Sequence, residues 1–485
     1  MKLFVIGWDN DDKDYADVIL GLKKRGHEIA YWVGNNQDYF EKNNKQQFNN
    51  TVFQYFRDAV NGIPPKELEN IIFDPPSEDL IKQFYDTELT VQTMMRKFLG
   101  SGKSLLEMRH TYYHYLQYWQ GVIKKFKPDV VIFCLWPHSG YDYVLYCLAK
   151  SLGIKTIMFS FTRVSDRLLL LNDLTIGSRA LQEELERNKN RQFNIEDLSP
   201  DIRKDYQRQI GNDIGAVPTD LKLTKKKYSR SLFSTKKMGI ILKAFFDFSI
   251  FKKVFFYLVN KIGPNLVKEY KKFQIIPDFD KKFVYVPLHF QPEASTSPLG
   301  GLFIDQILMI EILSAAIPDD WLIYVKENPF QWLIGGYYFG QFRYKNYYEE
   351  LNKLKKVRLV PVEINSLELI RKAEVIASVT GTAGWEAVLR SKPAMVFGHA
   401  WYKDCPGIFK VESVESCQKA IKDILEGFTI SKQDMINYLV SFDRSSHHGY
   451  FEEWVKKQSV VQGSELTKSF LNALIKEIEG IEAVG

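Results

Sequence analysis

The chain of 485 residues contains little cysteine, no long apolar run and no large excess of charge of either sign. Its four cysteines form no CxxC pair and have no histidine at zinc-finger spacing, so neither disulfides nor structural zinc are expected. No segment reaches about 18 uninterrupted apolar residues, so no membrane-spanning helix is predicted. The apolar run at the start is too short for a signal peptide and indicates a first strand. We therefore expect a cytoplasmic protein.

The net charge of +6 is mild and does not favour nucleic acid as a partner. Hydrophobic residues make up 45% of the chain and charged residues 26%, so the composition is that of a globular protein. The length predicts two or three domains, each able to bury a core.

Short β-branched or aromatic runs alternate with helical stretches in two parts of the chain, which predicts an α/β fold with parallel sheets. Expected strands are 3–6, 29–33, 129–135 and 155–159 in the first part, and 283–286, 321–325, 357–360, 375–379 and 394–397 in the second. We predict two Rossmann-like domains facing a central cleft, with helical insertions, one of them at about 35–125. The predicted domain ranges are 1–280, 281–430 and a helical tail without a further strand at 431–485.

A basic and aromatic segment stands out at about 224–262, where lysines and arginines interleave with phenylalanines. Such a segment could lie on an anionic membrane surface at the inner face of the cell membrane. It could equally be an amphipathic connector whose phenylalanines pack into the protein. Both interpretations stay open.

In an open parallel sheet, ligands bind at the loops that follow the carboxyl ends of the strands. Three expected strands of the second part end in polar, Gly- or Pro-bearing loops, which predicts one composite site for an anionic ligand. The first loop carries His289, Gln291, Glu293, Ser295 and Thr296. Glu293 has the chemistry of a nucleophile, a general base or a stabiliser of a cationic transition state. His289 would donate to an anionic leaving group, or be hydrogen-bonded locally.

The second loop begins Lys326-Glu327-Asn328-Pro329. Lys326 would supply a positive charge to a phosphate and Asn328 a neutral hydrogen-bond donor. The alternative is a Lys-Glu pair on the surface, which would contribute little free energy. Arg343 and Lys345 follow soon after. They could add positive charge to the site, or they could equally lie on an exposed helix face.

The third loop, Thr380-Gly381-Thr382-Ala383-Gly384-Trp385-Glu386, leads from a strand into an expected helix. Glycines permit close approach of the backbone, and hydroxyls together with helix N-terminal amides can hold phosphate. Glu386 would cap the helix or bind a ribose hydroxyl. A structural turn without a ligand is the alternative for this loop taken alone.

These three loops, with Phe-Gly-His-Ala-Trp-Tyr-Lys-Asp-Cys-Pro-Gly from Phe397 to Gly407, resemble the bacterial capsular polysaccharide biosynthesis family, which includes Kdo transferases. The resemblance covers about 283–408 and adds Tyr402 to the expected nucleotide-sugar-binding residues. Where the family has Lys-Glu-His-Pro, this chain has Asn328 in place of His. A carboxylate shortly before Ala-Ser is the family's proposed nucleophile, and Glu293 matches that position as Glu where Asp is usual.

The resemblance implies a GT-B glycosyltransferase that moves a sugar, Kdo or another ulosonic acid, from a CMP-activated donor to a capsule or lipopolysaccharide glycan or glycolipid. The expected nucleotide-sugar-binding residues are His289, Gln291, Lys326, Asn328, Thr380, Gly381, Thr382, Glu386 and Tyr402. Asp9 and His138, after strands of the first part, are the candidate acceptor-side acid or base groups beside Glu293. Both could equally be loop residues that are hydrogen-bonded locally. No cofactor or metal is expected, because no Asp-x-Asp pair sits at a strand end near the motifs.

Two alternatives stay open. One is a UDP-sugar-using transferase or epimerase on the same fold. The other is a non-catalytic assembly protein at a membrane surface, with 224–262 as its working part.

Overall fold

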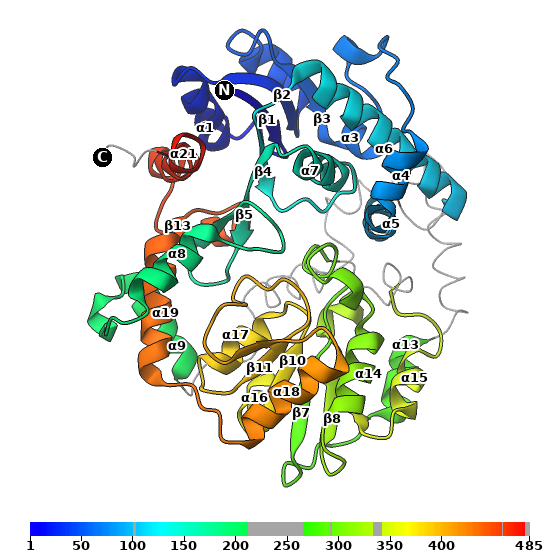
Figure 1. Cartoon of the computed structure of the whole chain (residues 1–485), viewed down its shortest axis with the longest axis vertical. Coiled ribbons are helices and arrows are strands. Elements are labelled where there is room, and N and C mark those ends of the chain that lie inside the picture. Colours follow the sequence, from blue (N-terminus) through cyan, green and yellow to red (C-terminus); the bar gives the residue numbers. More distant parts are fainter. Residues whose placement is uncertain (100–102, 212–264, 292, 333–341, 458, 481–485) are drawn as a thin grey trace, which may run out of the picture. The chain divides into compact units, whose positions relative to one another are not determined.

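The computed structural model describes residues 1–99, 103–211, 265–291, 293–332, 342–457 and 459–480 (Figure 1). The chain divides into two compact units. The first contains Met1–Asp205, Ser297–Gly301 and Gln433–Gly485, and the second contains Tyr206–Thr296 and Leu302–Lys432. The segment 224–262 lies outside the described residues, so both of its interpretations remain predictions. Within the described ranges, no helix is long and apolar enough to cross a membrane.

The first unit is built on a seven-stranded sheet in the order β13-β6-β5-β4-β1-β2-β3. Its strands are β1 (Lys2–Ile6), β2 (Glu28–Gly34), β3 (Val52–Tyr55), β4 (Val130–Leu135), β5 (Lys155–Phe161), β6 (Arg167–Leu171) and β13 (His447–His448). The five strands from β3 to β5 are parallel, while β6 and β13 are added antiparallel at one edge. The order of the parallel strands, 3-2-1-4-5, is that of a Rossmann sheet.

The second unit holds a six-stranded parallel sheet in the order β12-β11-β10-β7-β8-β9. Its strands are β7 (Phe283–Pro287), β8 (Leu322–Lys326), β9 (Val357–Leu359), β10 (Val375–Ser378), β11 (Ala394–Val396) and β12 (Ile408–Lys410). Counted within the unit, this order is 6-5-4-1-2-3, again the Rossmann order. The α/β class and the two Rossmann-like sheets of the predicted GT-B plan are therefore confirmed.

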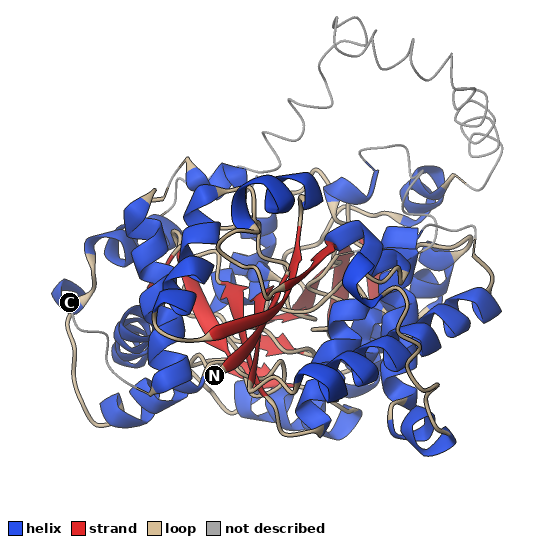
Figure 2. Cartoon of the chain, turned by 90° about the horizontal axis from the view of Figure 1, so that it is seen from above, coloured by secondary structure: helices blue, strands red, loops and turns tan. Residues whose placement is uncertain are grey.

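Helices cover the strands in both units (Figure 2). Strands such as β7 and β10 are buried nearly throughout, as a parallel sheet covered on both faces requires. In the first unit the helices are α1 (Lys13–Lys24), α2 (Gln37–Tyr39), α3 (Phe56–Asn61), α4 (Glu78–Gln83), α5 (Tyr85–Leu99), α6 (Leu105–Phe126), α7 (Tyr141–Ser151), α8 (Arg179–Asn188), α19 (Lys432–Ser445), α20 (Glu453–Lys456) and α21 (Ser464–Glu479). In the second they are α13 (Leu266–Phe273), α14 (Gln306–Ala316), α15 (Tyr347–Lys353), α16 (Ser366–Lys372), α17 (Thr382–Val388) and α18 (Val414–Leu425), while α9 (Pro200–Ile210) spans the division.

The C-terminal segment differs from the separate tail expected at 431–485. It is helical, but it packs within the first unit, where α21 lies beside α1 (Figure 1). The contact is so close that a Cβ on Gly21 would lie 2.6 Å from Leu471 Cδ2. Phe470 enters an aromatic cluster with Trp8 and Phe159, with ring centroids 5.7 and 4.9 Å away. The first unit is thus completed by the end of the chain.

Four described strands were not expected. The prediction that the tail adds no strand is wrong, because β13 pairs with β6. The region 35–125, expected to be a helical insertion, is mostly helical but contributes β3 to the sheet. The strands β6 and β12 are the other additions. All four contain five residues or fewer, and β3, β12 and β13 lie at sheet edges.

Candidate functional site

The second sheet has a topological switch point between β7 and β10, because β8 and β9 lie on one side of β7 and β10 to β12 on the other. In open α/β sheets, ligands bind outside the carboxyl ends of the strands at such a point. The loop after β7 carries His289, and the loop after β10 carries Thr380. The backbone N–H of Thr380 donates to His289 Nε2 at 3.2 Å. The structure therefore joins two of the polar loops that the sequence assigned to one site.

His289 is buried where the two loops meet. Its Nε2 also lies 3.2 Å from Ser378 Oγ, and Ser378 Oγ accepts from the Gly381 N–H at 2.8 Å. Burial, and secondarily the charge of Arg343, lowers the pKa of His289 to about 4. The imidazole is therefore neutral at physiological pH, and its Nε2 accepts a hydrogen bond from the backbone N–H of Thr380. Its expected role as a donor to a leaving group remains a prediction.

Two glycines in the third loop are required by close approach. A Cβ on Gly381 would lie 2.8 Å from Ser378 Oγ and 3.2 Å from the His289 ring. A Cβ on Gly384 would lie 2.6 Å from Tyr402 Oη. The Tyr402 hydroxyl in turn donates to the carbonyl of Gly381. Tyr402 is fully buried, and its hydroxyl fixes the backbone of the loop at Gly381.

The helix α17 opens directly from this loop. Its N-cap residue is Gly381, which has no side chain to cap the first turn. Thr382 is exposed, whereas the buried Thr380 hydroxyl donates to the Ser295 carbonyl at 2.8 Å. Glu386 is half-buried, and this burial raises the pKa of its carboxyl group. The first-turn amides and the Thr382 hydroxyl are thus placed where a ligand could meet them.

Lys326 and Glu327 do not form the surface pair considered as an alternative. Both side chains are buried, and each has separate partners. The Lys326 ammonium donates to Ser366 Oγ at 2.8 Å and to the Ile364 carbonyl. Burial lowers the pKa of Lys326 to about 8, although nearby Glu363 opposes the shift. Asn328 is half-buried, and its backbone N–H donates to Glu327 Oε1 at 2.7 Å.

Arg343 is the residue that the sequence interpretation missed. An exposed helix face was one explanation for it, but its side chain is fully buried and pairs with the equally buried Glu327. Arg343 Nε donates to Glu327 Oε2 at 2.8 Å, and its Nη2 donates to the His289 carbonyl at 2.9 Å. Burial lowers the pKa of Arg343, but the charge of Glu327 outweighs this and holds it above its ordinary value. The guanidinium therefore ties the loop after β7 to β8.

Gln291 completes this buried network. Its Oε1 accepts from Arg343 Nη1 at 2.6 Å and from Gln306 Nε2 at 2.8 Å, while its own Nε2 donates to the Ile304 carbonyl at 2.9 Å. Gln291 was expected to bind the nucleotide sugar. The structure instead engages its amide with protein groups on both sides, so it shapes the loop that carries Glu293.

Glu293 lies beyond this network and is half-buried. Ser295 Oγ donates to Glu293 Oε2 at 2.8 Å, and the Glu293 carbonyl accepts from the backbone N–H of Thr296 at 3.2 Å. These bonds turn the chain back toward the loop after β10, where Thr380 meets Ser295. A carboxylate at the switch point, held by a neighbouring hydroxyl, fits the chemistry expected of Glu293.

Asp9 and His138 follow β1 and β4, which are neighbours at the switch point of the first sheet. Burial, with smaller contributions from Asp11 and Asp12, raises the pKa of Asp9 to about 6. His138 Nδ1 lies 2.8 Å from the Trp136 carbonyl. Its backbone N–H donates to the carboxylate of Asp142 at 3.1 Å. The acceptor-side acid or base roles expected of Asp9 and His138 remain predictions.

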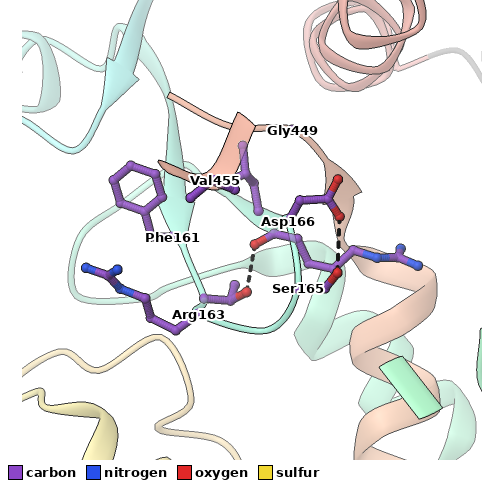
Figure 3. Close-up of a pocket in the computed structure, with 9 residues that line it drawn as sticks. Phe161, Arg163, Ser165, Asp166, Gly449 and Val455 are labelled. Carbon is purple, nitrogen blue, oxygen red and sulfur yellow. Dashed lines mark hydrogen bonds between the residues drawn. The ribbon is translucent and has the colours of Figure 1, made fainter. Parts of the chain in front are cut away.

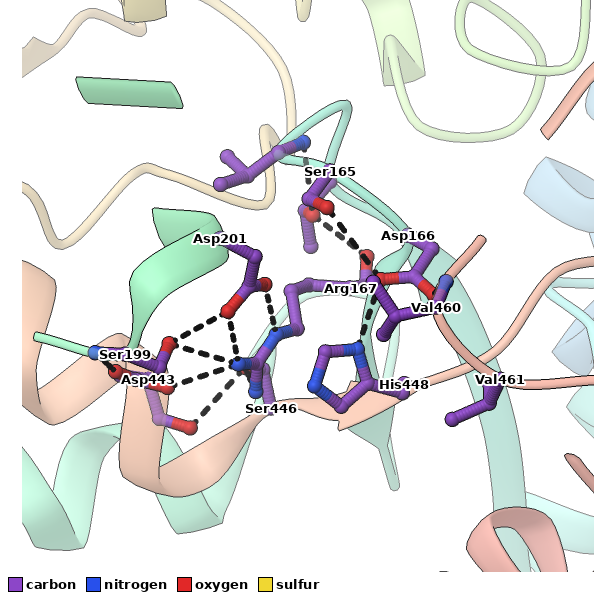
Figure 4. Close-up of polar contacts among 12 residues, drawn as sticks. Ser165, Asp166, Arg167, Ser199, Asp201, Asp443, Ser446, His448, Val460 and Val461 are labelled. Carbon is purple, nitrogen blue, oxygen red and sulfur yellow. Dashed lines mark hydrogen bonds and ion pairs between the residues drawn. The ribbon is translucent and has the colours of Figure 1, made fainter. Parts of the chain in front are cut away.

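A second polar cluster of the first unit, shown in Figure 4, contains Asp166, Asp201 and His448, whose ligand atoms lie within 4.8 Å of one another. All three are already engaged. Asp166 Oδ1 lies 2.8 Å from His448 Nδ1, and Arg167 donates to both oxygens of Asp201 at 2.9 and 3.0 Å. Burial would raise the pKa of Asp201, but Arg167 lowers it to about 2. The cluster therefore serves as an ion-pair network between β6, α9 and the C-terminal segment.

Solved structures similar to this chain include two kinds of sugar enzyme. UDP-GlcNAc 2-epimerase from Methanocaldococcus jannaschii is 16% identical, with a TM-score of 0.27, over 91% of this chain and 98% of that one. The beta Kdo 2,7 transferase of Thermosulfurimonas dismutans KpsC is 12% identical, with a TM-score of 0.31, over 79% and 95%. Similarities this low establish neither a donor nor an activity. No curated protein matches.

Residues 301–429 match the family described as "Capsule polysaccharide biosynthesis protein". This match includes the loops after β8 and β10 and the Tyr402 segment. The resemblance predicted from the motifs is thus confirmed: the second unit of this chain carries the pattern of the capsule polysaccharide biosynthesis family.

Proposed function

We propose that this chain is a glycosyltransferase of bacterial capsule polysaccharide synthesis, with a nucleotide-activated sugar held at the switch point of the second sheet. The observation that carries the proposal is the junction of the loops after β7 and β10, where Thr380 N–H meets His289 Nε2 at 3.2 Å. This junction puts the family's motifs at the place where Rossmann sheets bind ligands. The family match over residues 301–429 supports the same site.

The donor we propose is a CMP-linked sugar, Kdo or another ulosonic acid. Its phosphate would bind at the open first turn of α17, where backbone N–H groups and the Thr382 hydroxyl can donate to it. Lys326, at the end of β8, would stabilise the phosphate by its positive charge without donating to it directly. Its ammonium already donates to Ser366 Oγ and to the Ile364 carbonyl. Asn328, in the family's His position, would donate a neutral hydrogen bond. These groups would stabilise the charge that develops on the leaving phosphate without a metal ion.

In the transfer step, the bond between the anomeric carbon and the phosphate oxygen breaks, and the electron pair leaves with the nucleotide. Glu293 would stabilise or attack the oxocarbenium-like centre. An acceptor hydroxyl then forms the new bond to the anomeric carbon and loses its proton, and where Glu293 has bonded to that carbon, this second displacement breaks the bond and frees the carboxylate. Asp9, with a pKa of about 6, would take that proton, and His138 is the second candidate for this role.

Calorimetric binding of CMP, UDP, CDP and GDP to the full chain tests the donor site. We expect selective binding of CMP that weakens in Lys326→Ala. Preference for UDP, with turnover of a UDP-sugar in the absence of an acceptor, would replace the transferase by the epimerase alternative. Absence of binding by all four nucleotides would refute the proposed function.

Glu293→Gln tests the catalytic assignment. We expect turnover to fall by at least about 100-fold, while the affinity for the nucleotide stays within about twofold, because the carboxylate would act on the sugar and not on the phosphate. Glu311→Gln, at an exposed position of α14 in the same unit, is the matched control and should leave both unchanged. Unchanged turnover in Glu293→Gln would remove Glu293 from the mechanism.

A membrane surface remains a proposed partner through the segment 224–262. Lysines beside phenylalanines would bind anionic lipid by charge and by apolar insertion. Pelleting with vesicles of anionic and of neutral lipid, at low and high salt, tests this interaction. Equal recovery with both lipids would favour the packed connector.

A further inference from the structure

The helix α6 of the first unit carries two histidines on its solvent side. His110 and His114 are four residues apart, so they follow one another on the same face of the helix. The buried residues of α6, among them Tyr112, Tyr115 and Trp119, lie on the opposite face, and the helix packs against α5 and α7 (Figure 1). Both histidines are exposed and therefore accessible to a dissolved ion.

The two imidazole rings already lie beside each other. Their centroids are 4.2 Å apart, and the ring planes meet at 57°. Among the described residues, no group hydrogen-bonds to either ring. A transition-metal ion binds imidazole nitrogen at about 2.0–2.1 Å in a roughly tetrahedral arrangement, so two nitrogens on one ion lie about 3 Å apart. Two neighbouring rings of this kind reach that separation by small rotations of their side chains.

The backbone that carries the pair is well ordered by the helix itself. The helix α6 is 22 residues long and begins in a capping box, in which the side chains of Ser104 and Glu107 each accept from the other's backbone N–H. His110 and His114 lie well inside the helix, in its second and third turns. Binding an ion would therefore order only two side chains and no backbone, which keeps the entropic cost of binding low.

Another group of described side chains has ligand atoms close enough to hold an ion, namely Asp166, Asp201 and His448. Asp166 and Arg167 line a small hollow beside the β5–β6 loop (Figure 3). The guanidinium of Arg167 already provides the cation of this group, because it donates to both oxygens of Asp201 (Figure 4). A metal ion would have to displace this guanidinium, whereas the two exposed histidines need to lose only water.

We propose that His110 and His114 form a chelating site for a divalent transition-metal ion of the class of Zn²⁺, Ni²⁺ and Cu²⁺. Neutral imidazole is a common ligand of these ions. The two nitrogens occupy two coordination positions, and water fills the others because the site is exposed. Mg²⁺ and Ca²⁺ prefer oxygen ligands and should not compete. The site shares no residue with the proposed donor site and goes beyond the proposed function.

Calorimetric titration of the full chain with nickel, copper, zinc and magnesium chloride tests the site, at pH 7.5, without an affinity tag and without nucleotide. We expect Ni²⁺ to bind, Cu²⁺ to bind more tightly in the usual order of first-row ions, and Mg²⁺ not to compete with either. Absence of binding by Ni²⁺, Cu²⁺ and Zn²⁺ overturns the proposal, whatever the nucleotide experiment shows. Displacement of Ni²⁺ by equimolar Mg²⁺ would indicate oxygen ligands and would equally overturn it.

Single variants of the pair show whether the two rings act together. His110→Gln and His114→Gln should each weaken Ni²⁺ binding by at least about tenfold, because one remaining imidazole cannot chelate the ion. His448→Gln is the control for the group around Asp166, and it should leave the affinity for Ni²⁺ within about twofold. If both variants of the pair bind Ni²⁺ as the natural chain does, or if His448→Gln abolishes binding, the proposed site is wrong.

Thermal unfolding supplies a second measurement. Glutamine is a good helix former, so the exposed substitutions should leave the unfolding midpoint unchanged when no metal is present. An ion that binds the native chain better than the unfolded chain raises the midpoint. We therefore expect Ni²⁺ to raise the midpoint of the natural chain but not that of the double variant His110→Gln/His114→Gln. Equal shifts in the two proteins would place the ion elsewhere and overturn the proposal.

Discussion

Replacing Arg343 by methionine removes a cation from a place where its side chain has no exposure to solvent. The change leaves the Glu327 carboxylate buried without its charge partner, with Tyr348 Oη at 2.6 Å and Asn328 N at 2.7 Å as its remaining donors. Removing one member of a buried ion pair typically costs about 3–5 kcal/mol, because the remaining charge loses its compensation in a medium of low dielectric constant. We expect a loss of this size in Arg343→Met.

Urea unfolding of the full chain, followed by circular dichroism, measures this loss as a lower midpoint of the transition of the second unit. Lys345→Met is the matched control. It removes the same charge two residues away at an exposed position, and it should change the free energy of unfolding by no more than about 0.5 kcal/mol.

The double variant Glu327→Leu/Arg343→Met separates the effect of the unpaired charge on stability from the effect of the guanidinium on the position of the loop after β7. It leaves no unpaired charge, so it should recover a large part of the lost stability. It still lacks the bonds from the guanidinium to the His289 carbonyl and to Gln291, so nucleotide affinity should stay reduced by about tenfold or more. A free energy of unfolding for Arg343→Met within about 1 kcal/mol of the natural chain would refute the reasoning. A double variant with full nucleotide affinity would show that the network is structural and nothing more.

Three further predictions concern other parts of the chain. The folded-state pKa of Asp9, about 6, is above its ordinary value of 3.8, so the stability that its protonated form favours is lost as pH rises from about 4 to about 6. Asp9→Asn should therefore stabilise the protein at pH 7.5 by roughly 1 kcal/mol after solvent screening and have little effect near pH 4, as urea unfolding at the two pH values would show. Gly381→Ala places a Cβ 2.8 Å from Ser378 Oγ and should cost about 1–3 kcal/mol, whereas exposed Thr382→Ala should cost less than about 0.5 kcal/mol; equal losses in urea unfolding would contradict the close-approach argument. Phe470→Ala should destabilise the first unit by about 3–5 kcal/mol in thermal unfolding, because its ring lies in the cluster around Trp8, and an unaffected first unit would show that the end of the chain is dispensable.

Much of the fold could be predicted because its signals are local. The expected strands at 3–6, 29–33, 283–286 and 375–379 each match a described strand to within about two residues, since a parallel strand covered on both faces needs a continuous apolar run. The short strand β3 was hidden among polar residues, and β13 has two residues. Strands of this kind form because a neighbouring strand offers hydrogen bonds, which no local pattern reveals.

For the candidate site, the sequence predicted the position of the polar loops but not the partners of their side chains. The sequence showed which loops carry polar groups, because they directly follow apolar runs, and it showed that the loop after Thr380 has glycines that permit close approach of the backbone. It did not show which polar groups would be engaged inside the protein. Gln291 and His289 were both expected to contact the ligand, yet each makes several hydrogen bonds to protein groups far away in the chain.

By itself, the sequence determined the α/β class, the presence of one Rossmann-like sheet in each part of the chain, and the polar residues of the loops after the strands. These follow from apolar periodicity and from the geometry of parallel strands. The tertiary structure decided that Arg343 is buried against Glu327. It also decided that α21 completes the first unit. Burial and partner choice depend on residues distant in the chain, so they exist only once the chain has folded.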